Sequence, residues 1–359
     1  MISQIKISLD DYYELKNLKE NVYYPLTKLV DKKNFNNILK NYRLVSGKIF
    51  PLPIFLSVEK NIALNLKLNQ TYNLSYRNQN IGKLKVEDTY RVNKIKACKK
   101  IFKTSSLKHP GVRKFMETKE FFIGGTIKQL NNSIEKEKYK YLKPSSVKKI
   151  IKKNKWKSVA GFQTRNIPHR AHEQLLRTSL EYSEGLFIQP LLGNKKKNDF
   201  TNEAVFKTYK FLIKNYFPKN KILLGPLYAS MWYAGPREAV FHAIIRKNYG
   251  CNNFIVGRDH AGVGSFYKKY DAQNIFKLFK KNLNINILKF AGPFFCNKCD
   301  SVVTENSCKH FKKNKKLIIE ISGSEVRRKL LKNMKISHKI IRPEIVSILQ
   351  KIQNIFINK

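Results

Sequence analysis

The chain has 359 residues, 42% of them hydrophobic, and no apolar run approaches the roughly 18 residues of a membrane-spanning helix, so a helical membrane protein is not expected. Its 71 lysines and arginines against 25 acidic residues give a net charge of +46, which an RNA or DNA partner would explain. The lysines are spread over the whole chain and are accompanied by abundant Asn, Ile, Tyr and Phe, as in proteins of AT-rich genomes, so we interpret runs such as Lys195–Lys197 as solvated surface.

The first region, residues 1–142, contains short apolar runs separated by Gly, Pro and Asn, notably Gly47–Val58, Tyr72–Tyr76 and Phe121–Ile127. Short apolar runs bounded by turn residues are typical of strands, so this region is predicted to be a mainly β domain with some helix. Its acidic start lacks the basic-then-apolar order of a signal peptide, and we expect a soluble, cytoplasmic protein.

The second region, residues 143–295, has longer units in which predicted helices and strands alternate. In chain order the expected elements are a helix at Val147–Lys155 capped by Ser145, a strand at Trp156–Phe162, a helix at Pro168–Ser183, a strand at Leu186–Leu191, a helix at Glu203–Tyr216, a strand at Ile222–Leu227, a helix at Glu238–Tyr249 and a strand at Asn253–Val256. This alternation predicts an α/β domain with a parallel sheet, and ligands of such sheets bind at the carboxyl ends of the strands.

The third region, residues 296–359, contains a cysteine cluster followed by a helical part from Glu325 to Phe356. The cluster has the pattern C-x2-C-x8-C-x-H and consists of Cys296, Cys299, Cys308 and His310. Three thiols and one imidazole suit a tetrahedral Zn²⁺, and because they would fill its coordination shell we predict a structural rather than a catalytic zinc. The alternative is a set of unpaired thiols; an odd total of five cysteines argues against a disulfide framework.

The segment Gly161–Glu173 (GFQTRNIPHRAHE) follows a predicted strand and opens a predicted helix, whose first N–H groups favour anions. Its polar side chains at the turn are Gln163, Thr164, Arg165 and Asn166. The planar fork of Arg165 matches tetrahedral oxyanions, and His169 and His172, three residues apart, should share one helix face. We interpret the segment as a polyphosphate site. Packing histidines or a zinc pair are the alternatives, although the segment lacks the spacing and the glutamate of H-E-x-x-H.

A second polar segment, Gly257–Gly262 (GRDHAG), follows the last strand predicted in the second region. Its glycines allow the backbone to approach a ligand closely, and Arg258 and His260 could add charge or hydrogen-bond donors. The segment Gly235–Glu238 (GPRE) opens another helix and is a further candidate. Within that helix, His242 is interpreted as a packing residue.

These segments resemble those of one family. Gly161–Glu173 is similar to the Q-T-R-N-x-x-H-x-x-H motif of ATP sulfurylases and to the H-x-G-H loop of the wider nucleotidylyltransferase superfamily, with Ala171 at the glycine position. Gly257–Gly262 and Ile321–Arg327 (ISGSEVR) also resemble family segments. The resemblance implies a Rossmann-like nucleotidylyltransferase domain at 143–295, a PUA-like β-rich domain at 1–142 and a small zinc-containing helical subdomain at 296–359. No Walker A motif is present, so a fused kinase domain is not expected.

The resemblance also implies an activity, in which ATP and sulfate give adenosine 5′-phosphosulfate and diphosphate. The residues implied to hold sulfate are Gln163 and Arg165, helped by the backbone of Ala261. The implied catalytic core is Thr164, Arg165 and Asn166, and the implied phosphate ligands are Asn166, His169 and His172. The nucleotide side would be lined by Gly257, Arg258, Asp259 and His260. Mg²⁺ would arrive with ATP, and a homo-oligomer, here expected to be a dimer, is typical of the family.

Two other functions compete with this hypothesis. A basic protein that binds RNA through its PUA-like domain would account for the charge but not for the two central motifs. An adenylyltransferase with another acceptor would keep the fold, but the combination of Q-T-R-N with G-R-D-H-A-G favours sulfate. We expect no specific nucleic-acid partner and no membrane partner.

Overall fold

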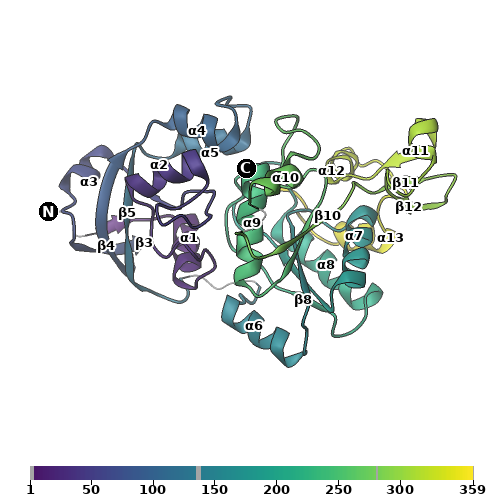
Figure 1. Cartoon of the computed structure of the whole chain (residues 1–359), viewed down its shortest axis with the longest axis horizontal. Coiled ribbons are helices and arrows are strands. Elements are labelled where there is room, and N and C mark those ends of the chain that lie inside the picture. The colour runs from purple at the N-terminus through teal and green to yellow at the C-terminus, as the bar shows by residue number, and fades with distance from the viewer. Residues whose placement is uncertain (1–3, 135–138, 280–281, 359) are drawn as a thin grey trace. The chain divides into compact units, whose positions relative to one another are not determined.

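The structure is a computed structural model that describes residues 4–134, 139–279 and 282–358 (Figure 1). The chain divides into two compact units. Unit 1 comprises Met1–Lys148, Tyr228–Gly250 and Asp259–Ile285; unit 2 comprises Lys149–Leu227, Cys251–Arg258 and Asn286–Lys359. Each unit is therefore assembled from three separate stretches of chain. The three-part division expected at residues 142 and 295 remains a prediction.

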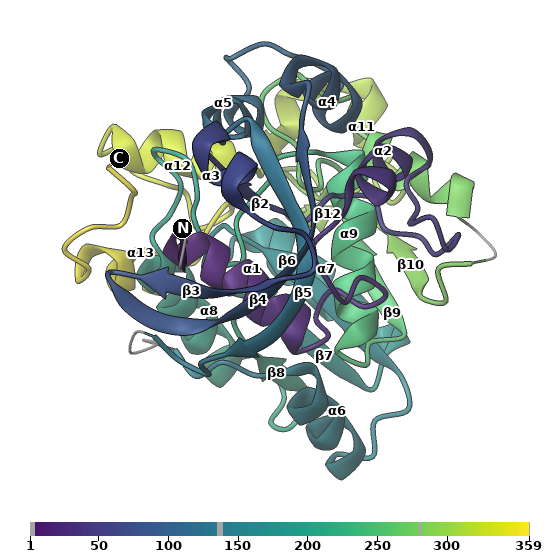
Figure 2. The ribbon, with the colours of Figure 1, turned by 90° about the vertical axis from the view of Figure 1, so that its left-hand side faces the viewer.

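Unit 1 contains a five-stranded sheet with the order β1-β3-β4-β5-β2. The strands are β1 (Gln4–Lys6), β2 (Leu56–Val58), β3 (Thr71–Tyr76), β4 (Gln79–Arg91) and β5 (Phe121–Leu130). Only β1 and β3 are parallel, and the other neighbours are antiparallel. Figure 2 shows how strongly the long strands β3, β4 and β5 bend, and register shifts after Lys83 and Val86 increase that bend in β4.

The helices of unit 1 are α1 (Leu9–Lys19), α2 (Lys32–Asn41), α3 (Lys60–Asn65), α4 (Lys94–Phe102), α5 (Pro110–Glu117), α9 (Pro236–Asn248), α10 (Asp271–Asn274) and the 3₁₀ helix η1 (Ile275–Phe279). Helix α9 is almost entirely buried. Arg237 donates hydrogen bonds to the carbonyls of Ile38 and Leu39 in the last turn of α2 at 2.9 and 3.1 Å, where a cation is favoured by the helix dipole. Arg237 therefore serves the fold of unit 1.

Unit 2 contains an all-parallel sheet with the order β10-β9-β6-β7-β8. Its strands are β6 (Val159–Thr164), β7 (Gly185–Pro190), β8 (Ile222–Leu224), β9 (Asn253–Val256) and β10 (Asn286–Lys289), and the connecting helices are α7 (Arg170–Tyr182) and α8 (Asn202–Tyr216). The chain runs outward from β6 through β7 to β8, whereas β9 and β10 lie on the other side of β6. The sheet order thus reverses between β6 and β9. At such a switch point the carboxyl ends of the strands form a crevice that binds ligands.

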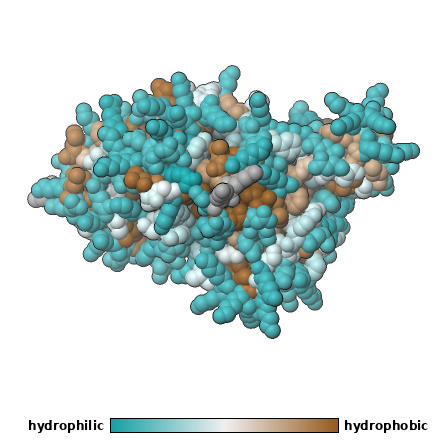
Figure 3. Space-filling model, viewed as in Figure 1, coloured by the Kyte–Doolittle hydropathy of each residue, from teal (hydrophilic) through white to brown (hydrophobic). Residues whose placement is uncertain are grey.

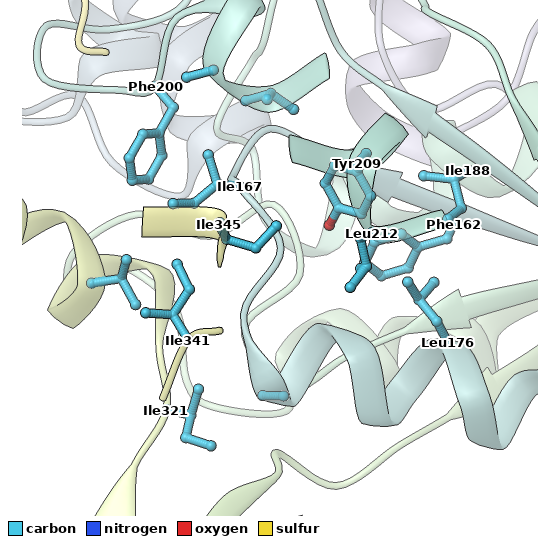
Figure 4. Packing of buried hydrophobic residues seen from close by; sticks show 14 of the residues in the cluster. Phe162, Ile167, Leu176, Ile188, Phe200, Tyr209, Leu212, Ile321, Ile341 and Ile345 are labelled. Carbon is cyan, nitrogen blue, oxygen red and sulfur yellow. The ribbon is translucent and has the colours of Figure 1, made fainter. Parts of the chain in front are cut away.

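The core of unit 2 joins this sheet to its C-terminal helices, α12 (Gly323–Leu331) and α13 (Pro343–Gln350). Figure 4 shows Phe162, Leu176, Ile188, Tyr209 and Leu212 gathered in the part of the core that the sheet, α7 and α8 supply. The C-terminal contributors to the same core include Ile321, Val326, Ile341 and Ile345. Each such buried side chain stabilises the fold by roughly 1.5–3 kcal/mol. The C-terminal stretch therefore completes the core that supports the sheet.

A small antiparallel sheet with the order β12-β11-β13 lies in the same unit. It consists of β11 (Phe294–Cys296), β12 (Ser301–Val303) and β13 (Ile318–Glu320), accompanied by α11 (His310–Lys313) and the 3₁₀ helix η2 (Lys315–Leu317). The remaining helix, α6 (Pro144–Lys153), crosses the boundary between the two units. None of the helices in the described residues is long and apolar enough to cross a membrane. Hydrophilic residues cover most of the face shown in Figure 3.

Most expected elements of the second region are present within a few residues of their predicted ends. Ser145 is an exception, because α6 begins at Pro144 and Ser145 lies inside its first turn. The helical part expected from Glu325 to Phe356 consists of two helices, α12 and α13, and Pro343 begins the second.

Candidate active site

The turn after β6 is shaped by its own side chains. The backbone N–H of Asn166 donates to Oγ1 of Thr164 at 3.1 Å, and the Thr164 hydroxyl lies at the same distance from the Asn166 carbonyl oxygen, to which it donates. Gln163 is only 8% exposed, and its Nε2 finds no hydrogen-bond partner within the described part of the chain. A buried amide donor without a partner is costly, so this one is suited to an acceptor on a ligand.

His169 and His172 stack on each other at the start of α7, with ring centroids 3.8 Å apart and planes inclined by 17°. His169 is the N-cap of the helix rather than part of it, and its Nδ1 accepts the backbone N–H of His172 at 3.3 Å. In the neutral ring the proton of His169 is thereby assigned to Nε2. The expected pairing of the two imidazoles is therefore present, although one of them precedes the helix.

Both imidazoles are held neutral. Burial lowers the pKa of His172 from 6.5 to about 4, partly offset by a hydrogen bond to the carbonyl of Ile167. Burial, followed by the proximity of His172, lowers the pKa of His169 well below its usual value. The hydroxyl of Tyr209, on α8, lies 3.2 Å from Nδ1 of His172 and helps to fix its ring. At neutral pH the pair thus offers neutral donors whose charge can change when an anion binds.

Arg165 belongs to a buried cationic cluster around a single carboxylate, which we name the Asp199 cluster. Its members are Arg165, Lys195, Lys196, Asp199 and Arg327. Asp199 is fully buried, and its carboxylate lies 3.6 Å from Nε of Arg165, 3.2 Å from Nζ of Lys196 and 3.4 Å from Nη2 of Arg327. Four basic side chains around one buried carboxylate leave an excess of positive charge, which makes the turn after β6 attractive to anions.

Asn166 is held from the C-terminal part of the chain. Its Oδ1 accepts a hydrogen bond from Nη2 of Arg327 at 2.8 Å. Gly323, the first residue of α12, approaches so closely that a Cβ there would lie 2.9 Å from Nδ2 of Asn166. The segment Ile321–Arg327, noted above only for its resemblance, therefore supports a predicted site residue.

Gly257 and Arg258 follow β9. Because β9 pairs with β6 in parallel, the carboxyl ends of the two strands lie at the same edge of the sheet. The side chain of Arg258 lies against Gly292, where a Cβ would be 2.7 Å from Cδ of Arg258. The predicted segment Gly161–Glu173 thus continues from the end of β6, and Gly257–Gly262 begins directly after β9, the two neighbouring strands that flank the switch point of unit 2.

The next three predicted residues, Asp259, His260 and Ala261, belong to unit 1. Ala261 has a φ of 55°, in the left-handed region, and its carbonyl accepts the N–H of Gly235 at 3.1 Å. Nε2 of His260 lies 3.0 Å from Nδ1 of His242, on α9. The other ring nitrogen of His242, Nε2, lies 3.5 Å from Oε1 of Glu238.

The interpretation of His242 as a packing residue is therefore incomplete. It is buried, and it also connects Glu238 to a predicted site residue. The Glu238 carboxylate accepts the backbone N–H groups of Trp232 and Ala234, each at 3.0 Å, which fixes its position. This carboxylate–imidazole–imidazole chain orients the ring of His260.

The cysteine cluster is assembled as expected. The four ligand atoms of Cys296, Cys299, Cys308 and His310 lie within 4.8 Å of one another. Sγ of Cys299 lies 3.8 Å from Sγ of Cys308 and 3.3 Å from Nδ1 of His310. A tetrahedral zinc with Zn–S bonds of about 2.3 Å places neighbouring sulfurs about 3.8 Å apart, so the four residues fit a metal ion such as zinc.

Comparison with known proteins agrees with this geometry. Residues 1–132 match the PUA-like domain, and residues 138–352 match ATP-sulfurylase. The chain belongs to the ATP-sulfurylase family. The resemblance inferred from the motifs is thereby confirmed, as is the predicted fold of a PUA-like β domain, a parallel α/β domain and a C-terminal Cys/His cluster.

Relatives of this ATP-sulfurylase family member match over nearly its whole length. A sulfate adenylyltransferase from Staphylothermus marinus is 35% identical over 357 residues, which cover 99% of this chain and 92% of the relative. One from Carboxydothermus hydrogenoformans is 38% identical over 351 residues, covering 97% and 91%. A solved structure titled hexameric APS kinase from Thiobacillus denitrificans matches with a TM-score of 0.72 at 17% identity, which shows a shared fold. That match covers 98% of this chain and 63% of the solved one.

Four members of the Asp199 cluster were missed from the sequence: Lys195, Lys196, Asp199 and Arg327. Lys195 was included in a run interpreted as solvated surface, but its side chain is 5% exposed; the solvated interpretation was wrong for this residue. Asp199 and Arg327 lie 34 and 162 positions after Arg165, and no local spacing connects them to it. The similarity of Ile321–Arg327 to a family segment was the one available indication for Arg327.

Proposed function

We propose that Gln163–His172 is where this enzyme, a sulfate adenylyltransferase by family, joins sulfate to the α-phosphate of ATP. The observation that carries the proposal is the pairing of a buried cationic cluster around Arg165 with two neutral histidines at the switch point of a parallel sheet. The products are adenosine 5′-phosphosulfate and diphosphate.

Sulfate is a weak nucleophile and the phosphorus it attacks is anionic, so positioning and charge neutralisation must supply the rate. Gln163 and Arg165 hold sulfate, and the help expected from the backbone of Ala261 remains a prediction. The unpartnered Nε2 of Gln163 and the excess of cations around Arg165 support this assignment. Thr164, Arg165 and Asn166 form the catalytic core.

Asn166, His169 and His172 bind the phosphates of ATP. The Nε2–H assigned to His169 is the donor that its hydrogen-bonding leaves for a phosphate oxygen. As negative charge develops on the leaving diphosphate, it raises the proton affinity of both imidazoles, which lets them stabilise that charge. Gly257 and Arg258 line the nucleotide side, and the same role for Asp259 and His260 remains a prediction.

The chemical step is a direct in-line displacement. A sulfate oxygen forms a new bond to the α-phosphorus while the bond from that phosphorus to the bridging oxygen of diphosphate breaks, and no protein nucleophile takes part. Mg²⁺ would arrive with ATP, held mainly by the phosphates rather than by protein ligands, and would neutralise part of their charge.

The Cys296 cluster is proposed to hold a structural zinc, because three thiolates and one imidazole leave no open coordination position for a substrate. When bound, the metal would stabilise the small sheet that contains β11, β12 and β13. A cytoplasmic location and a dimeric state remain predictions.

The experiment that tests the proposed function measures diphosphate release from ATP in the presence and absence of sulfate or molybdate. Wild-type release should depend on the oxyanion. Arg165→Ala should lower it by roughly a hundredfold or more while the folded state persists. Arg328→Ala, which removes an arginine 50% exposed on α12, is the matched control and should retain wild-type turnover. Near-normal turnover by Arg165→Ala would remove the central assignment.

A further inference from the structure

Lys195 is unusual among the lysines of this chain. It lies in the loop between β7 and α8, its side chain is 5% exposed, and its Nζ finds no hydrogen-bond partner among the residues that the structure describes. Lys197, two positions further on, is exposed. The general abundance of lysine explains an exposed residue such as Lys197, but it does not explain a buried ammonium without a partner.

The surroundings of Lys195 make the missing partner an anion. The charged groups that act on it are Asp199, Arg165 and Arg327, and Lys196 is its neighbour in the chain. Asp199 already lies within 3.6 Å of three of these cations, so its single negative charge cannot neutralise Lys195 as well. A buried, uncompensated ammonium is strongly destabilising, and a bound oxyanion is the ligand that removes this cost.

The protonation of Lys195 is consistent with a missing anionic partner. Burial lowers its pKa from 10.5 to about 7; Asp199 raises it, and Arg165 and Arg327 lower it further. Without an anion the ammonium is therefore close to losing its proton at neutral pH. A dianion beside Nζ would favour the charged form and raise the pKa again.

The loop position indicates which anion. Strand β7 pairs with β6 in parallel, with Thr164 opposite Pro190, so the loop that carries Lys195 leaves the same edge of the sheet as Arg165. We propose that Lys195 is a further ligand of the sulfate that Arg165 holds, donating from Nζ to one of its oxygens. This inference rests on the proposed function. Asp199 acts as a positioning residue that fixes the cations around the oxyanion.

The test compares Lys195→Met, Lys195→Arg and Lys197→Met in the full chain. Removing a charge-assisted hydrogen bond costs roughly ten- to hundredfold in affinity. Lys195→Met should therefore raise KM for sulfate by about that factor and leave KM for ATP within about twofold of wild type. Lys195→Arg, which keeps the charge, should recover most of the sulfate affinity, and Lys197→Met should behave as wild type.

The pH profile supplies a readout that a merely structural lysine would not change. As the pH rises through about 7, wild-type Lys195 loses its proton, so kcat/KM for sulfate should fall. Lys195→Arg remains charged and should lack that fall. Equal losses in Lys195→Arg and Lys195→Met, or an unchanged sulfate KM in Lys195→Met, would overturn the proposal.

Direct binding separates this inference from the proposed function. Titration calorimetry with inorganic sulfate, without ATP, should show binding to wild type and Lys197→Met that is weakened at least tenfold in Lys195→Met. If sulfate binding is weakened in Lys195→Met as expected but wild type releases no diphosphate, the proposed function fails and the Lys195 site stands. If wild type is active but its sulfate affinity does not depend on residue 195, the Lys195 site fails alone.

Discussion

Acidification is predicted to destabilise the folded protein through His172. Its imidazole is neutral in the folded state because burial lowers its pKa to about 4, whereas in the unfolded chain its pKa is 6.5. Between these two values the unfolded state binds more protons than the folded state, so stability falls as the pH falls through this window. At pH 7.5 both states are neutral at this residue and its contribution is close to zero.

The loss of folding stability depends on how far the pH lies below 6.5, the pKa of His172 in the unfolded chain. At about pH 5 the unfolded imidazole is protonated and the folded one is still mainly neutral, so the loss is about 1.5 pH units at 1.36 kcal/mol each, or about 2 kcal/mol. Urea unfolding at about pH 7.5 and pH 5 measures this difference. In His172→Gln the loss of stability between the two pH values should be smaller than in wild type by about 2 kcal/mol.

The comparison uses the change with pH, so any constant cost of the substitution cancels. His338→Gln is the control, because it removes an exposed histidine from the same unit and should leave the wild-type difference in place. An equal pH dependence in His172→Gln and wild type would show that the imidazole of His172 is not held neutral, and the description of both stacked imidazoles would have to change.

Two further predictions concern the metal cluster and the chain of ionisable groups on α9. Cys296→Ser should lower the zinc content of the purified protein and its thermal stability. Cys251→Ser, which changes a buried cysteine outside the cluster, should retain the metal. Equal zinc content in both variants would refute Cys296 as a ligand. His242→Phe removes the ring nitrogen that lies 3.0 Å from Nε2 of His260, so kcat/KM should fall about tenfold and its dependence on pH should change. His242→Gln should lose less of kcat/KM. Identical pH profiles of kcat/KM in the two variants would contradict the role of His242 in orienting His260.

The elements that the sequence predicted best are those whose burial leaves a simple pattern. Asn253–Val256 was predicted as a buried strand and is β9, because a central parallel strand is apolar on both faces. The longest strand, β4 (Gln79–Arg91), was not predicted. Its exposed face carries lysine, glutamate and aspartate, so only alternate residues such as Leu84 and Val86 are buried. A half-exposed strand of this composition resembles a polar loop.

The residues of the candidate site likewise fall into those that the sequence predicted and those that it did not. The turn from Gln163 to Asn166 and the two histidines were predicted because neighbouring residues form a continuous motif with a physical purpose. Lys195 and Asp199 could not be predicted, since burial and partners depend on tertiary structure and a lysine run gives no indication of which member points inward. The functional hypothesis depended more on the resemblance of the motifs to those of ATP sulfurylases than on residue spacing alone.

The contact between Asn166 and the segment Gly323–Arg327 has a consequence for synthesis. The motif around Asn166 is translated well before Arg327, its hydrogen-bond partner, which follows 161 residues later. Translation at roughly 5–20 residues per second separates the two by about 8–30 s. The contact that holds Asn166 is therefore missing until residue 327 has been synthesised, and a chain terminated before that residue would lack it however well its sheet had folded.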